Sequence, residues 1–158
     1  MSRELYYYLR FQAVISASFN FFINGMIAAL IYHNADFVVT DAISVTIDIT
    51  VTCLLIFTIT APFCRASLRR DKTGGLLAAE NLPARMLAGL SRYPVLLSVS
   101  LSLCTALILS TLAVSFLALL GVSAVPFYLY IALKSVLSAM IGAFATYVLL
   151  IAGMYKSK

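Results

Sequence analysis

Long apolar stretches alternate with short polar segments along the whole chain. Four of the stretches are long enough to cross a bilayer as a helix, which takes about 20 residues, and they lie at about 11–32, 42–64, 95–120 and 125–155. Apolar residues run continuously within them, which excludes the alternating strands of a membrane β-barrel. The pattern therefore predicts an all-α membrane protein, with four transmembrane helices forming a single domain.

The polar segments mark where these helices begin and end. Thr40 or Asp41 is suited to cap the second span, and Pro62 predicts a kink or an end near the close of that span. The connection 65–93 is the only sizeable segment outside the spans. Pro83 begins a short amphipathic stretch within it, which we expect to form a helix on the inner membrane surface.

The composition agrees with a membrane protein. Of the 158 residues, 63% are hydrophobic and 11% are charged, whereas about a quarter of the residues in a soluble domain are charged. The apolar core of the first span exceeds the roughly 7–15 residues of a cleavable signal peptide. We therefore expect the first span to stay in the protein.

The basic residues predict an orientation. The loops 33–41 and 121–124 contain no Lys or Arg, whereas ten of the eleven basic residues lie before the first span, between the second and third, or after the fourth. The positive-inside rule then places both termini and the central connection in the cytoplasm. Such a basic surface also suits anionic lipid head groups, so the partners we expect are the bilayer and anionic lipid, and not nucleic acid.

Each span carries a polar residue at a similar depth. A helix rises about 1.5 Å per residue, which places these residues about 10–13 Å below the outer ends of their spans: Asn24, Asp48, Thr111 and Lys134. A charge at the centre of a membrane helix costs at least about 2.5–3.5 kcal/mol. Asp48 and Lys134 are therefore expected to meet inside the bundle as opposite charges.

A polar stripe also runs along the first span. Its members recur at intervals of four and so share one helix face: Gln12, Ser16, Asn20 and Asn24. The predicted substrate or ion site combines this stripe with the polar layer. In it Asp48 binds a proton or cation, Lys134 supplies the counter-charge or binds an anion, Asn20 and Asn24 orient substrate or water, and Thr111 completes the layer.

The sequence contains no catalytic or metal-binding pattern. His33 is the only histidine and lies in an outer loop, away from any Ser or Cys nucleophile at membrane depth. The three cysteines lack the spacing of metal ligands or of a disulfide framework. We therefore expect no enzymatic activity, no catalytic residue, no metal site and no cofactor.

The stretch Phe19–Gly25, together with Asp48, resembles small bacterial four-helix inner-membrane proteins described as permease-like or of unknown function. The resemblance implies a multi-pass protein of the bacterial inner membrane and, by description, transport. The leading hypothesis is thus a small permease-like transporter of an ion or small solute, acting as a homo-oligomer because four helices enclose little volume. The alternative is a non-catalytic scaffold or accessory subunit whose polar layer is structural. A lipid-handling role is the third.

Overall fold

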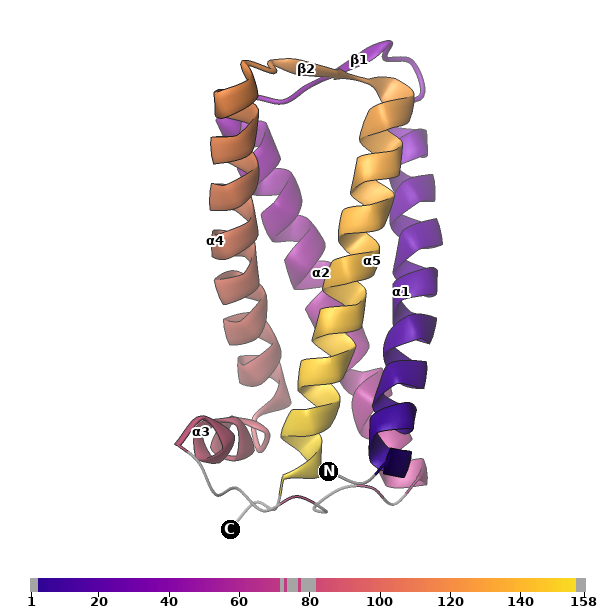
Figure 1. Cartoon of the computed structure of the whole chain (residues 1–158), viewed down its shortest axis with the longest axis vertical. Coiled ribbons are helices and arrows are strands. Elements are labelled where there is room, and N and C mark those ends of the chain that lie inside the picture. The colour runs from indigo at the N-terminus through magenta and orange to yellow at the C-terminus, as the bar shows by residue number, and fades with distance from the viewer. Residues whose placement is uncertain (1–2, 72, 74–76, 78–81, 156–158) are drawn as a thin grey trace.

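The chain forms four long helices that stand side by side, with a short helix across one end and a two-stranded ribbon across the other (Figure 1). The computed structural model describes residues 3–71, 73, 77 and 82–155. The elements of this part of the chain are α1 (Arg3–Tyr32), β1 (Phe37–Val39), α2 (Ala42–Arg70), α3 (Leu82–Leu90), α4 (Pro94–Leu120), β2 (Ala124–Pro126) and α5 (Phe127–Met154).

The four long helices, α1, α2, α4 and α5, are each long and apolar enough to cross a membrane. The all-α class is therefore confirmed, together with four helices of spanning length and composition, whereas their topology and orientation in a membrane stay predictions. Two helices extend further than expected, because α1 begins at Arg3 and α2 runs to Arg70. Pro62 lies inside α2 and does not end it.

Local signals explain several helix ends. Asp41 is the N-cap of α2, where its carboxylate accepts hydrogen bonds of 3.0 Å from the amides of Ile43 and Ser44. A hydrogen bond from the Ser44 side chain, followed by those from the Ser44 and Ile43 amides, holds the pKa of the Asp41 carboxyl below its usual range. At the end of α4, Gly121 adopts the left-handed conformation with φ of 65°, which glycine enters without steric cost.

The ribbon was not expected from the sequence, which predicted loops in its place. Strands β1 and β2 pair antiparallel with Val38 opposite Val125, and both side chains are buried. The Thr40 amide extends the pairing by donating to the Ser123 carbonyl at 2.9 Å. The ribbon thus joins the α1–α2 connection to the α4–α5 connection. We call this end of the molecule the ribbon end.

The opposite end carries the start of α1, the end of α5 and helix α3, and we call it the terminal end (Figure 1). Helix α3 confirms the short helix expected after Pro83. Leu87 and Leu90 pack against the hydrophobic core, whereas Met86 is exposed. Its position on an inner membrane surface stays a prediction.

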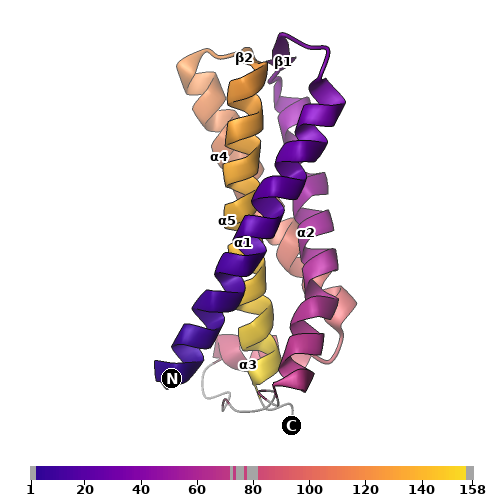
Figure 2. The ribbon, with the colours of Figure 1, turned by 90° about the vertical axis from the view of Figure 1, so that its right-hand side faces the viewer.

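The helices joined at the ribbon end, α1 with α2 and α4 with α5, are not the ones that pack together. Helix α1 packs along α5, and α2 packs along both α4 and α5, whereas α1 and α2 form no extended contact. In Figure 2, α1 crosses in front of α5 and diverges from α2 toward its N-terminal end. The shared neighbour α5 therefore holds α1 and α2 apart, and this separation creates the groove described below.

Candidate functional site: an ion pair and a lateral groove

Asp48 of α2 and Lys134 of α5 form an ion pair inside the helix bundle. The Lys134 ammonium donates to Asp48 Oδ1. It also donates to Thr52 Oγ1, with 2.9 Å between Lys134 Nζ and that oxygen. Tyr130 donates its hydroxyl to the second carboxylate oxygen of Asp48 at 3.2 Å. Both charges therefore have opposite-charge and hydrogen-bonding partners, as a low-dielectric environment requires.

The pair is shielded unequally. The Lys134 side chain is 11% exposed, whereas that of Asp48 is 32% exposed. The Tyr130 ring packs edge-on against Tyr32 of α1, with 5.1 Å between the ring centroids. The network thereby links α1, α2 and α5 near the ribbon end.

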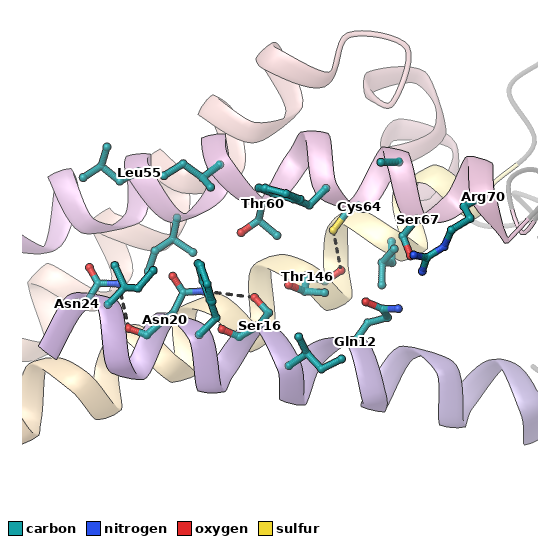
Figure 3. A pocket seen from close by; sticks show the side chains of 18 of the residues that line it. Gln12, Ser16, Asn20, Asn24, Leu55, Thr60, Cys64, Ser67, Arg70 and Thr146 are labelled. Atoms are coloured by element: carbon teal, nitrogen blue, oxygen red, sulfur yellow. Dashed lines mark hydrogen bonds between the residues drawn. The ribbon is translucent and has the colours of Figure 1, made fainter. Parts of the chain in front are cut away.

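A groove of about 500 Å³ lies between α1 and α2, with α5 behind it (Figure 3). Arg70 is one of its lining residues, at the terminal end of α2. Helix α1 contributes two adjacent rows of residues, one polar and one apolar. The polar row is Gln12, Ser16, Asn20 and Asn24, and the apolar row is Ile15, Phe19, Ile23 and Ile27.

The polar row lies deeper in the groove than the apolar row. Its four residues are half-buried, whereas the four apolar residues are exposed. The Asn20 and Asn24 amides donate to the carbonyls of Ser16 and Asn20, at 2.8 and 3.1 Å. Ser16 donates across to the Gly142 carbonyl of α5 at 3.0 Å. The row therefore forms a polar floor that is anchored to α5.

Thr146 of α5 completes this floor. Its side chain is 4% exposed, lines the groove, and has no hydrogen-bond partner for Oγ1 among the described residues. Figure 3 places it between Ser16 and Gln12 of α1 and Cys64 of α2. A buried hydroxyl without a partner costs about 1–3 kcal/mol. Thr146 thus places an unmet hydrogen-bonding group beside the groove.

Arg70 gives the terminal end of the groove a positive charge. Its Nε donates to Asp71 Oδ1 at 3.0 Å, and its side chain is 74% exposed. Tyr8 of α1 donates its hydroxyl to Asp71 Oδ2, also at 3.0 Å. The Arg70 hydrogen bond, followed by the one from Tyr8, holds the pKa of the Asp71 carboxyl below its usual range. This cluster ties α1 to α2 where the groove begins.

The residues predicted from the sequence fall into three places. Asp48 and Lys134 meet as an ion pair, and Asn20 and Asn24 line the groove, whose lining does not include the pair. Thr111 is exposed on α4 and donates to the Leu107 carbonyl of its own helix at 2.7 Å. The structure therefore does not bring the five residues into one layer, because equal depth does not fix the direction in which a side chain points.

Several residues of the site were missed by sequence reasoning. Thr52 lies four residues after Asp48, and Tyr130 lies four residues before Lys134. This spacing puts each on the same helix face as its charged partner, so the positions four residues after Asp48 and four residues before Lys134 carried the signal. Thr146 and Arg70 had no such signal, because their role depends on the separation of α1 from α2.

Among the described residues, no group of three His, Cys, Asp or Glu side chains could hold a metal ion. Comparisons with known protein families, with curated proteins and with solved structures each found no match to this chain. The expectations of a bacterial source and of a permease-like activity thus stay predictions from the sequence.

Proposed function

We propose that this chain is a small permease-like transporter of the bacterial inner membrane, and that its substrate occupies the groove between α1 and α2. The observation that carries the proposal is the polar floor of a 500 Å³ groove within helices that are long and apolar enough to span a membrane. Polar groups at membrane depth are costly and commonly mark a substrate pathway. The volume lies within the roughly 300–1,000 Å³ of small-molecule sites.

The Asp48–Lys134 pair has a different role in this proposal. Asp48 lies seven residues from Leu55, where the groove lining on α2 begins, which is about 10 Å along the helix. The pair fastens α2 to α5 on the ribbon-end side of the groove lining of α2. We infer that it acts as a latch, whose release would let α2 move relative to α5 and open the groove toward the ribbon end, as in the rocking of transporter halves.

Flux into proteoliposomes tests the proposal. Labelled rubidium, chloride, alanine, glucose and cholate would be offered to vesicles containing the wild type, Thr60→Trp or Thr58→Trp. Thr60 lines the groove, whereas Thr58 is exposed on the same helix outside the lining. We expect at least one probe to enter faster with the wild type and with Thr58→Trp than with Thr60→Trp. Equal entry of every probe in all three preparations would contradict transport through the groove.

The scaffold alternative is favoured by one observation. Each charge of the Asp48–Lys134 pair already has a second polar partner, Tyr130 or Thr52, which suits a structural link between α2 and α5. In that case, the groove would be filled by a helix of a partner or of a second copy. Replacing the pair with apolar residues, as described below, tests whether the pair is a latch or a structural link, and the flux assay above tests transport itself.

A further inference from the structure

We propose that the groove binds a facially amphiphilic organic anion, a molecule with one apolar face, hydrogen-bonding groups along the other face and an acidic group at one end. This inference takes the groove as the substrate site of the proposed transporter and names the chemical class of its ligand. It depends on four features of the groove: its apolar rims, its polar floor, the unpartnered hydroxyl of Thr146 and the charge of Arg70.

The rims of the groove are apolar and open to the surroundings. Phe19 of α1 is 62% exposed, and Ile59 and Phe63 of α2 are 53% and 70% exposed. Because α1 and α2 have the length and composition of membrane-spanning helices, these rims would face the acyl chains of lipid. A molecule could therefore enter sideways from the bilayer, provided that its outward face is apolar.

The floor requires a second, polar face on the same molecule. Half-buried polar side chains line it from both helices, Ser16 and Asn20 on α1 and Thr60 on α2. Ser16 and Asn20 already donate to backbone carbonyls, but the Asn20 amide oxygen can still accept a hydrogen bond. A plain acyl chain would offer it no donor, and a hydrated ion would leave the rims without apolar contact. Only a ligand with two chemically distinct long faces satisfies both rows.

Thr146 provides independent support, since its side chain lines the groove and its buried Oγ1 has no partner among the described residues. A ligand hydroxyl, carbonyl or carboxylate would satisfy it. At the terminal end, Arg70 has its Nε engaged by Asp71, and a guanidinium carries four further N–H groups that suit a carboxylate, sulfonate or phosphate. The acidic end of the ligand is therefore assigned to the Arg70 end of the groove.

Equilibrium binding of labelled cholate to the full chain in lipid nanodiscs tests the inference, after subtraction of binding to empty nanodiscs. Cholate carries hydroxyls on one face of a rigid apolar body and a carboxylate at one end. Thr146→Val removes the floor hydroxyl, and Arg70→Gln removes the charge. We expect each to weaken cholate binding by roughly 2- to 12-fold, the range of a single hydrogen bond. Thr60→Trp should abolish binding.

Matched controls show whether the effect belongs to the groove. Thr111→Val removes an exposed hydroxyl outside the groove, and Arg69→Gln removes an exposed charge next to Arg70 that does not line it. Both should bind cholate as the wild type does. Palmitate should compete poorly, because it lacks a polar face.

Three outcomes would overturn the inference: no saturable cholate binding by the wild type, equal loss in the controls, or palmitate competing better than cholate. If the wild type is a dimer that does not bind cholate, and Thr60→Trp converts it into monomers, the groove would be assigned to a second copy of the chain. Binding without flux of any probe would overturn transport and leave the ligand class standing. Flux of another probe without cholate binding would overturn the ligand class and leave transport standing.

Discussion

At the scale of single residues, two buried hydroxyls differ from the other hydroxyls of the helices. Thr46 and Thr50 each donate to the carbonyl four residues earlier at 2.7 Å, the usual way for a hydroxyl to be satisfied within a helix. Ser138 and Thr146 of α5 are buried and have no hydrogen-bond partner among the described residues. They lie eight residues apart on one face of α5, with Lys134 four residues before Ser138.

Ser138 supplies a prediction about stability. Its side chain is 0% exposed, so Ser138→Ala removes an unmet polar group. The unfolding free energy should stay the same or rise by up to about 1–3 kcal/mol. The thermal unfolding midpoint in detergent, which should not fall, measures this. Ser102 is the matched control, because it is equally buried but donates to the Val99 carbonyl at 2.9 Å. Ser102→Ala should be destabilising. A larger loss in Ser138→Ala than in Ser102→Ala would mean that the Ser138 hydroxyl is satisfied, for example by water.

At the scale of elements, α1 and α5 are held together by small residues at their contact. A Cβ on Gly142 would lie 2.9 Å from Cγ of Asn20 and collide with its amide, and a Cβ on Gly25 would collide with the Ser135 hydroxyl. Close approach of this kind is typical of helix contacts in membranes. The close approach of α1 to α5 also positions the hydrogen bond from Ser16 to the Gly142 carbonyl. The α1–α5 contact therefore supports the floor of the groove.

Gly142→Ala should therefore separate α1 from α5 and displace Asn20. We expect a loss of about 1–3 kcal/mol in unfolding free energy, the usual cost of overpacking, and reduced flux of any probe that the wild type carries. Gly89→Ala is the control, because nothing lies within 4 Å of a Cβ at Gly89 in α3. It should be neutral or stabilising by up to about 1 kcal/mol, the difference in helix propensity. Equal behaviour of the two variants would argue against the close α1–α5 contact.

The ion pair between α2 and α5 makes a second prediction at this scale. Lys134→Met leaves the Asp48 carboxylate without its counter-charge and should destabilise the protein by up to about 3–5 kcal/mol. The loss should be smaller than this upper value, because the Asp48 side chain is 32% exposed and solvent can reach it. The apolar double variant Asp48→Leu/Lys134→Met should recover most of that loss. Thermal unfolding and probe flux would be measured on both variants. A double variant that regains stability but not flux supports the latch, whereas recovery of both would show that the pair is a structural link and not a latch.

At the scale of the whole molecule, the sequence predicts what depends on local composition and misses what depends on long-range pairing. Continuous apolar runs were sufficient to predict α1, α2, α4 and α5. Strands of three residues carry almost no sequence signal, and β1 pairs with β2 across two long helices, so the ribbon could not be foreseen. Depth arithmetic predicted the meeting of Asp48 and Lys134, yet Thr111 at the same depth points away. The groove required knowing that α1 packs on α5 and not on α2.

The arrangement of the ends also bears on orientation in the membrane. The ribbon end carries no Lys or Arg in segments 33–41 and 121–124, whereas Arg65, Arg69 and Arg70 gather at the terminal end. The positive-inside rule then predicts that the terminal end faces the cytoplasm. It follows that the Arg70 end of the groove would receive its ligand from the cytoplasmic leaflet, and that the ion pair would lie in the outer half.

Cysteine labelling in intact cells of a bacterial host tests this orientation. Two of the three native cysteines are buried and Cys104 is exposed, so all three would be replaced by alanine before a single cysteine is introduced at Asn34 or Tyr93, which are both exposed. A maleimide that cannot cross the inner membrane should label Asn34→Cys in intact cells and Tyr93→Cys only after the inner membrane is permeabilised. The opposite result would invert the molecule, place the Arg70 end of the groove on the outer side and reverse the direction from which its ligand enters.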